Sequence, residues 1–215
     1  GVNASKTFEV IKLNTTVNVE VEDNFYNKIE SINITINETT VTGSIKVDIN
    51  STLEGFTNIT RDLTLDGNKA QLNLTGLSVG EYNVTVFYDG DSRFNGNVTK
   101  DTFLVKKLAD YELNVTAQNI LYGEEENIVI TLPIDAQGNA KISIAGTDIT
   151  DRLVPVTDGR ANLTIPAYYL TADEYEVAVT FLDNNYGEKT NTTKFNISKA
   201  KSNVTVSTTN ISRGS

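Results

Sequence analysis

The most constraining feature of the sequence is an internal repeat with a period near ninety residues. The stretch Leu77–Val86 (LSVGEYNVTV) recurs as Leu170–Val179 (LTADEYEVAV), which places Tyr82 and Tyr175 93 residues apart. Three further pairs are 92 residues apart: Gly67 and Gly159, Phe94 and Tyr186, and Phe103 and Phe195. A period of this length has the size of one small β-sandwich. We therefore expect two tandem domains and not one domain of 215 residues.

Apolar and polar residues alternate in short runs along the whole chain. Runs such as Ile32–Ile36, Ile45–Ile49 and Ile128–Leu132 put every second side chain on one face, as in a strand with one buried face. Turn signals separate the runs, notably Asp66-Gly67-Asn68 and Asp158-Gly159, which suit hairpin turns with positive φ. No segment keeps a helical period for a dozen residues. The pattern predicts an all-β fold of two antiparallel sandwiches, each of about seven strands.

Three similar segments set the predicted domain limits. The residues around Phe8, Phe103 and Phe195 resemble three copies of one last strand, each followed by a link that contains lysine. We therefore assign 1–10 to the last strand of a preceding repeat, 11–106 to domain 1, 107–198 to domain 2, and 199–215 to the first strand of a following repeat. The links are short and lack a Gly/Ser-rich spacer, so we expect adjacent repeats to form a semi-rigid row. Unpaired strands at both ends favour weak head-to-tail self-association.

Composition excludes several classes of function. The net charge of −10, from 28 acidic and 18 basic residues, is spread without a basic stripe and argues against nucleic-acid binding. No apolar run is long enough to cross a bilayer, and no basic amphipathic helix is indicated, so we expect no membrane contact by this segment. Cysteine and histidine are absent, which removes thiolate and imidazole chemistry. No glycine-rich phosphate loop occurs, every Asp or Glu can be placed on an exposed strand face or loop, and no aromatic-lined cleft is implied, so we expect no catalytic residue and no cofactor.

Tyr82 and Tyr175 each begin a predicted strand after a connection that starts with Leu77 or Leu170. In immunoglobulin-type sandwiches a tyrosine at this place packs its ring inside and donates its hydroxyl to upstream backbone, the tyrosine corner. We interpret both tyrosines as structural residues. The alternative is a core tyrosine whose hydroxyl is solvated.

The quoted features resemble the bacterial Ig-like repeats of the Big_3 type, and more closely the tandem versions in adhesin-like surface proteins of methanogen-like archaea. The resemblance covers nearly the whole chain, twice, and includes the loop Gly90–Gly96 and the strand Thr102–Val105. Domain 2 departs from the pattern, because Asp173 replaces the corner glycine and Asp183–Tyr186 lacks a Gly-Asp pair. The resemblance implies two tandem immunoglobulin-like domains. It implies no single activity, because such domains act as spacers, adhesive modules and enzyme appendages.

Asn-x-Ser/Thr sequons are about three times more frequent than the roughly five that random placement would give. They lie at Asn3, Asn14, Asn33, Asn37, Asn50, Asn58, Asn73, Asn83, Asn97, Asn114, Asn162, Asn191, Asn196, Asn203 and Asn210. N-glycosylation outside the cell is one explanation, with Asn33, Asn73, Asn83, Asn97, Asn114 and Asn162 as candidates. Strand alternation in a chain rich in Asn and Thr is the other, because Asn and Thr two positions apart share one face.

Two minor sites are also indicated. Asp89 and Asp91 flank a glycine and are the candidate ligands for Ca²⁺, although acidic clusters of this kind are more often solvated. Lys12, Lys106 or Lys199, beside strand ends, could join an Asn in an isopeptide bond, but the sequence does not identify the acid that this reaction needs.

We expect the chain to be a non-catalytic stalk or spacer segment of an extracellular, cell-surface adhesin-like protein. Its partners would be adjacent Ig-like repeats and, through the full-length protein, other cells or surface glycans and proteins. One alternative is a glycan- or protein-binding module that uses loops at one sandwich end, with contacts from the exposed aromatics Phe25, Tyr26, Phe56, Tyr168 and Tyr169. The other is an ancillary domain pair of a secreted polysaccharide-degrading enzyme.

Overall fold

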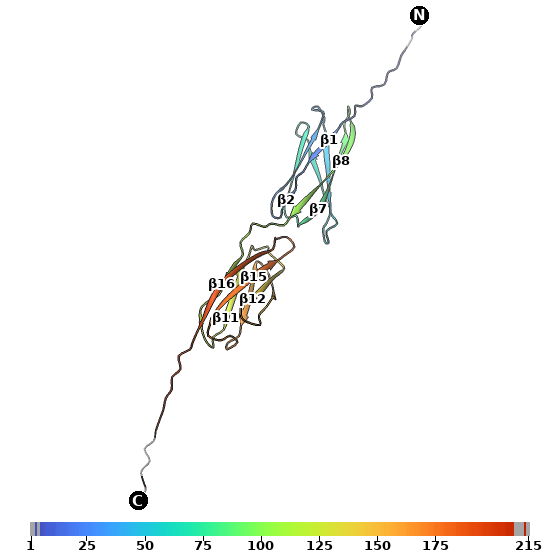
Figure 1. The fold of residues 1–215 in the computed structure, drawn as a ribbon. Coiled ribbons are helices and arrows are strands. Elements are labelled where there is room, and N and C mark those ends of the chain that lie inside the picture. Colours follow the sequence, from blue (N-terminus) through green and yellow to red (C-terminus); the bar gives the residue numbers. More distant parts are fainter. Residues whose placement is uncertain (1–2, 4, 209–212, 214–215) are drawn as a thin grey trace. The chain divides into compact units, whose positions relative to one another are not determined.

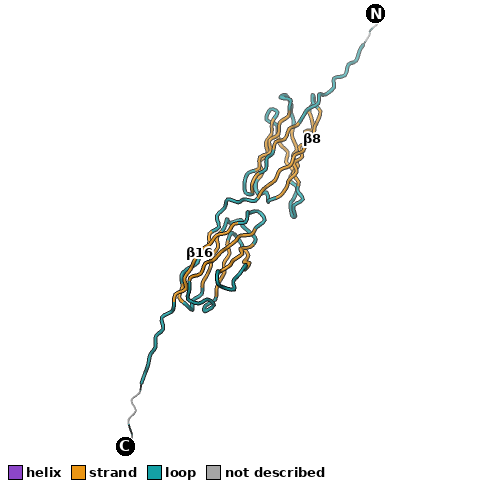
Figure 2. The backbone as a smooth tube through the Cα atoms, viewed as in Figure 1, coloured by secondary structure: helices purple, strands orange, loops and turns teal. Residues whose placement is uncertain are grey.

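The computed structural model describes residues 3, 5–208 and 213, and all regular structure among them is β-strand (Figures 1 and 2). The all-β prediction is therefore confirmed. The chain divides into two compact units, Gly1–Ala109 with Asn184–Gly187, and Asp110–Asp183 with Glu188–Ser215. Within this described part there is no helix with the length and apolar character needed to span a membrane.

The first unit is a sandwich of two sheets. The three-stranded sheet has the order β1-β3-β6 and consists of Val17–Glu20, Glu30–Ile36 and Lys69–Leu74. The five-stranded sheet has the order β2-β8-β7-β4-β5 and consists of Asn24–Phe25, Asn95–Lys106, Gly80–Gly90, Ser44–Asn50 and Ile59–Thr64. Neighbouring strands are antiparallel except β2 and β8, which run parallel with Asn24 opposite Val105.

The second unit repeats this topology strand for strand. Its three-stranded sheet has the order β14-β11-β9, from Arg160–Ile165, Glu126–Thr131 and Asn114–Thr116. Its five-stranded sheet has the order β10-β16-β15-β12-β13, from Ile120–Leu121, Lys189–Ser198, Glu174–Leu182, Asn139–Ile144 and Arg152–Pro155. Each unit has eight strands where about seven were predicted, because its first strand divides between the two sheets.

The alternating residues of the sequence form the core of each sandwich. In the first unit, Ile32 and Ile34 of β3 and Val47 of β4 are at most 1% exposed. In the second, Ile130 of β11 and Ile142 of β12 are fully buried. Burial of each such side chain contributes about 1.5–3 kcal/mol. The alternation therefore identifies the inward face of each strand.

The two predicted turns are tight and have positive φ, at Gly67 (62°) and Gly159 (68°). Backbone hydrogen bonds join Asp66 to Lys69 in both directions, as expected for a two-residue hairpin turn. The strands that these turns connect lie in different sheets, however, since β5 and β6 are not paired. The turns with positive φ were predicted correctly, but a local turn does not determine which sheet the next strand joins.

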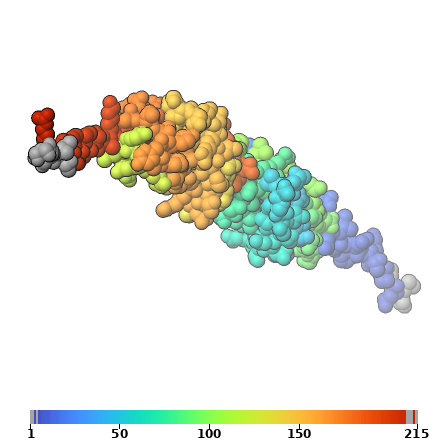
Figure 3. All heavy atoms as spheres, turned by 90° about the horizontal axis from the view of Figure 1, so that it is seen from below, coloured from blue at the N-terminus to red at the C-terminus, as the bar shows by residue number. Residues whose placement is uncertain are grey.

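The residues assigned to flanking repeats form no strand where they are described. Phe8 and Val10 are 88% and 83% exposed, and Val204 and Val206 are 87% and 80% exposed. Figure 3 shows residues 5–12 in blue and 199–208 in red as extended segments outside the packed bodies. Residues 1, 2, 4, 209–212, 214 and 215 lie outside the described part, and the sequon at Asn210 lies there too. The assignment of both segments to flanking repeats stays a prediction.

Candidate functional site

Tyr82 and Tyr175 occupy equivalent places at the start of β7 and β15. The Tyr82 hydroxyl donates to the Ser78 carbonyl at 2.8 Å, and the Tyr175 hydroxyl donates to the Thr171 carbonyl at 3.1 Å. The rings stack on the last strand of each sandwich, with centroids 5.2 Å from Phe103 and 5.4 Å from Phe195. Burial raises the pKa of Tyr82, so this hydroxyl stays protonated and acts as a donor. The geometry is that of a tyrosine corner, in which the side chain fixes the fold.

The first and last strands of each sandwich are held together by side-chain amides as well as by backbone. Asn97 Nδ2 donates to the Thr15 carbonyl at 2.6 Å, and Asn191 Nδ2 donates to the Leu113 carbonyl at 2.7 Å. A glycan at Asn97 would be attached to this same nitrogen, and glycosylation of Asn97 stays a prediction. The sequence contained the signal, because Asn97 and Asn191 recur 94 residues apart, close to the repeat period.

The other candidate asparagines lie on exposed strand positions: Asn33, Asn73, Asn83, Asn114 and Asn162. Gln71 Nε2 donates to Asn33 Oδ1, and Ser31 Oγ donates to Asn73 Oδ1, both at 2.9 Å. These bonds use the amide oxygen and not the nitrogen to which a glycan is attached. The Asn162 nitrogen donates to Asn127 Oδ1 and to its own sequon hydroxyl at Thr164, both at 3.3 Å.

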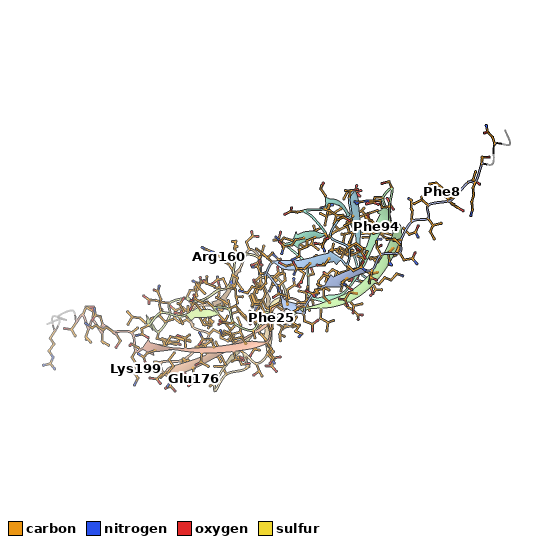
Figure 4. All side chains as sticks on the ribbon, turned by 90° about the horizontal axis from the view of Figure 1, so that it is seen from above. Phe8, Phe25, Phe94, Arg160, Glu176 and Lys199 are labelled. Atoms are coloured by element: carbon orange, nitrogen blue, oxygen red, sulfur yellow. The ribbon has the colours of Figure 1, made fainter. Side chains whose placement is uncertain are left out.

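Asp91, a candidate Ca²⁺ ligand, is engaged by its own sandwich. Its Oδ1 accepts from the backbone N–H groups of Arg93 and Phe94 at 2.7 and 2.9 Å, and its Oδ2 accepts from the Thr42 N–H at 3.0 Å. The bond from Arg93, with those from Thr42 and Phe94, holds the pKa of Asp91 well below its usual value. Asp183 Oδ2 accepts equivalently from Gln137 N at 3.2 Å. These aspartates order the loops that bury Phe94, labelled in Figure 4, and Tyr186.

Asp89 is exposed and adds no further ligand to Asp91. Among the residues that the structure describes, no three His, Cys, Asp or Glu side chains are grouped so that they could hold a metal ion. A Ca²⁺ site at this loop would have to break bonds that order it.

Glu30 and Glu126 are buried carboxyls that the sequence did not single out. They stand 96 residues apart at the start of β3 and β11 and are 4% and 2% exposed. Glu126 Oε1 accepts from the Gln118 N–H at 2.8 Å, whereas Glu30 Oε2 has no hydrogen-bond partner among the described residues. Burial raises the pKa of both carboxyls. Glu30 lines an open cleft of about 350 Å³ with Glu20, Glu22 and Asp23.

The lysine at the end of β8 forms an ion pair in place of an isopeptide bond. Lys106 Nζ lies 2.9 Å from Asp23 Oδ2, and both side chains are about half exposed. The bond from Lys106 lowers the pKa of Asp23, so its carboxyl is ionised at neutral pH. Lys12 and Lys199 are exposed beyond the strands.

The exposed aromatics proposed as contacts separate into two kinds. Phe56 is half-buried and packs edge-on against Tyr82, with ring centroids 5.3 Å apart, and Tyr26 is half-buried. Phe25, Tyr168 and Tyr169 are 49%, 70% and 48% exposed. Of the five proposed contact residues, Phe25, Tyr168 and Tyr169 are therefore the ones exposed enough to contact a partner.

Comparisons with known proteins show the fold but no family. No family model matches the chain, and no curated protein sequence matches it. The crystal structure of invasin, a bacterial integrin-binding protein, is similar with a TM-score of 0.55 and 14% identity, over 86% of this chain and 40% of that chain. The chain is thus similar to tandem Ig-like domains, which confirms the predicted fold class.

Two further solved structures are more distant. A two-domain fibronectin type III segment from chicken tenascin has a TM-score of 0.47 and 11% identity, over 82% of this chain and 97% of that one. A 1.5-MDa bacterial ice-binding adhesin has a TM-score of 0.36 and 13% identity, over 89% and 67%. The chain spans less than half of invasin, so nothing that invasin binds is transferred to it.

Proposed function

We propose that this chain is a non-catalytic stalk or spacer segment of an extracellular adhesin-like protein, built from Ig-like repeats. The observation that carries this proposal is the parallel pairing of first and last strands, β2 with β8 and β10 with β16. When these strands are parallel, the chain enters a sandwich at one pole and leaves it at the opposite pole. Repeats of this kind connect end to end with short links.

The same pairing suits a segment under tension. Force applied at the two ends of a sandwich acts along β2 and β8, so their contacts must break together and not one by one. In the first sandwich these contacts include Tyr26 N–H to the Lys106 carbonyl at 2.8 Å and Leu104 N–H to Asp23 Oδ1 at 3.0 Å. In the second, Tyr122 N–H donates to the Ser198 carbonyl at 2.8 Å, and Asn196 N–H donates to Asn119 Oδ1 at 2.8 Å.

The flanking segments support a longer array. Phe8 and Val10 precede Leu13 in the same pattern in which Phe103 and Val105 precede Leu108. Phe103 and Val105 are 1% and 5% exposed in the core, whereas Phe8 lies on the extended segment outside the first sandwich in Figure 4. A residue with this pattern is suited to the core of a preceding repeat. The resemblance to Big_3-type repeats of archaeal surface proteins agrees with such an array. The proposed glycosylation positions of this segment are Asn33, Asn73, Asn83, Asn97, Asn114 and Asn162.

Single-molecule pulling tests the mechanical role. The chain is held once at its two ends and once through cysteines introduced at Glu54 and at the C-terminus. Glu54 is exposed in the loop between β4 and β5, at the same pole as the end of β8, so this second geometry peels β8 from its end and does not shear β2 from β8. We expect a several-fold higher unfolding force for the first sandwich in the end-to-end geometry. Equal forces in the two geometries would contradict the proposal.

A further inference from the structure

The second sandwich has a longer connection than the first at one equivalent place. Tyr175 comes ten positions after Ile165 at the end of β14, whereas Tyr82 comes eight positions after Leu74 at the end of β6. Leu170 and Leu77 are both buried, at 8% exposed, so the added length lies before this shared anchor. The longer part of the connection, before Leu170, contains Tyr168 and Tyr169, which have no counterpart in the first sandwich.

Tyr168 contacts Tyr122, which follows β10, and Tyr169 is its neighbour in the chain. Tyr168, Tyr169 and Tyr122 are 70%, 48% and 41% exposed. The rings of Tyr122 and Tyr168 are in edge contact, with centroids 5.6 Å apart and an interplanar angle of 78°. The Tyr169 hydroxyl donates to Asp148 Oδ1 at 2.7 Å, and this bond raises the pKa of Tyr169. We call Tyr122, Tyr168 and Tyr169 the tyrosine platform.

The platform is fixed in place at a conformational cost. Tyr169 N–H donates to the Pro166 carbonyl at 3.2 Å, which closes a turn whose third residue, Tyr168, has a φ of 65°. Such a turn position favours glycine, and the shorter connection of the first sandwich has Gly76 with a φ of 74°. Gly123 leaves room for the ring, because a Cβ there would lie 2.8 Å from Tyr168 Cε1.

Folding of the sandwich does not account for the platform. A tyrosine that closed the core would be buried, as Tyr175 is at 8% exposed. The space beneath Tyr168 is only about 10 Å³ and is already lined by Leu170 and Ile197. An exposed, rigid aromatic surface held in an unfavourable backbone conformation is typical of a binding surface.

We propose that the tyrosine platform binds a neutral polysaccharide chain. The C–H face of a pyranose ring can pack on the exposed Tyr168 ring, while its hydroxyls bond to the Tyr122 hydroxyl and to Asp148, whose Oδ2 accepts no hydrogen bond within the described residues. The net charge of −10 and the carboxylates of Asp148 and Glu124 disfavour an anionic polysaccharide. This surface adds an adhesive role to the proposed stalk and does not depend on it.

Native affinity electrophoresis tests the proposal with hydroxyethylcellulose, laminarin, galactomannan and arabinoxylan as probes. We expect at least one of them to retard the protein, and Tyr168→Ala to weaken the apparent affinity about tenfold. Tyr168→Phe keeps the ring and should retain the retardation. Phe25→Ala removes an aromatic that is 49% exposed from the first sandwich and should have no effect.

Three outcomes would overturn the proposal: no retardation by any of the four polymers, retardation that Tyr168→Ala leaves unchanged, or loss of retardation in Phe25→Ala as well. Binding to polylysine alone would assign the surface to a basic protein partner instead. Because the platform is exposed, thermal unfolding of Tyr168→Ala should show both sandwiches folded, which separates lost binding from lost structure. None of these results alters the pulling experiment, so the two proposals fail separately.

Discussion

In the first sandwich, the connection from β6 to β7 turns at Gly76 and leaves an open space of about 190 Å³ beside Leu77 and Tyr82. In the second, the span from the end of β14 to the corner tyrosine is two residues longer, turns at Tyr168 and presents two exposed tyrosines. Both sandwiches have the same strand order and a tyrosine corner. In both, an asparagine of the last strand, Asn97 or Asn191, donates a hydrogen bond to the backbone near the first strand. The features that both sandwiches share stabilise the fold. The connection that carries Tyr168 and Tyr169 occurs in the second sandwich alone, so a binding activity is expected there.

The largest expected effect tests whether the two cores are independent. Phe103→Ala and Phe195→Ala each remove a ring that is 1% exposed and stacked on a corner tyrosine. Each should cost about 3–5 kcal/mol, and only in its own sandwich. Differential scanning calorimetry should show one transition lowered and the other unchanged. If both transitions shift together in either variant, the sandwiches are not independent folding units.

A smaller effect is expected at the tyrosine corners. Tyr82→Phe leaves the Ser78 carbonyl without its partner and should destabilise the first sandwich by about 1–2 kcal/mol. Tyr175→Phe should cost less, about 1 kcal/mol, because its acceptor bond is longer and Tyr175 is less buried. Urea denaturation gives both values. Unchanged midpoints in both variants would show that the hydroxyls are merely solvated.

The buried carboxyls should make stability depend on pH, with a difference between the sandwiches. The folded pKa of Glu30 is raised, so its favourable contribution is present below its ordinary value of 4.5 and is lost as the pH rises through the folded pKa. Glu30→Gln should therefore stabilise the first sandwich at pH 7 and have little effect at pH 4.

Glu126→Gln is the matched control for this pH dependence. Glu126 accepts a backbone bond that Glu30 Oε2 lacks, so the gain at pH 7 should be smaller. Melting curves of both variants between pH 4 and pH 7 measure the difference. A loss of stability in Glu30→Gln at pH 7 would mean that the ionised carboxylate contributes favourably.

The smallest expected effect concerns the turn at Tyr168. Tyr168→Gly relieves the positive φ but gives up the ring contact with Tyr122, so the second sandwich should gain less than about 1 kcal/mol. Polysaccharide retardation should be lost in the same variant. A clear loss of stability would instead identify Tyr168 as part of the core.

The sequence predicted the framework well because its signals are local and repeated. Alternation at Ile32–Ile36 identified a buried face, and the spacing of Tyr82 and Tyr175 identified equivalent strands. It did not predict the division of the first strand between sheets, because β2 and β10 are two residues long and pair with strands far along the chain. The bonds of Asn97 were missed because its sequon suggested a different role.

The tyrosine platform shows a second limit of sequence analysis. Tyr168 and Tyr169 could be identified as adjacent aromatics, but Tyr122 is distant in sequence and joins them only through the contact of β10 with β16. The exposure of the three rings depends on a turn geometry that tyrosine rarely adopts.

Replacement of the longer connection by the shorter one tests most directly whether the second sandwich folds without the tyrosine platform. Residues 166–173 of the second sandwich are replaced by Thr75–Gly80 of the first, which shortens the chain by two residues and removes Tyr168 and Tyr169. We predict that the second sandwich keeps its calorimetric transition within about 1 kcal/mol while polysaccharide retardation is lost. Loss of that transition would contradict the separation, because the longer connection would then be required for folding.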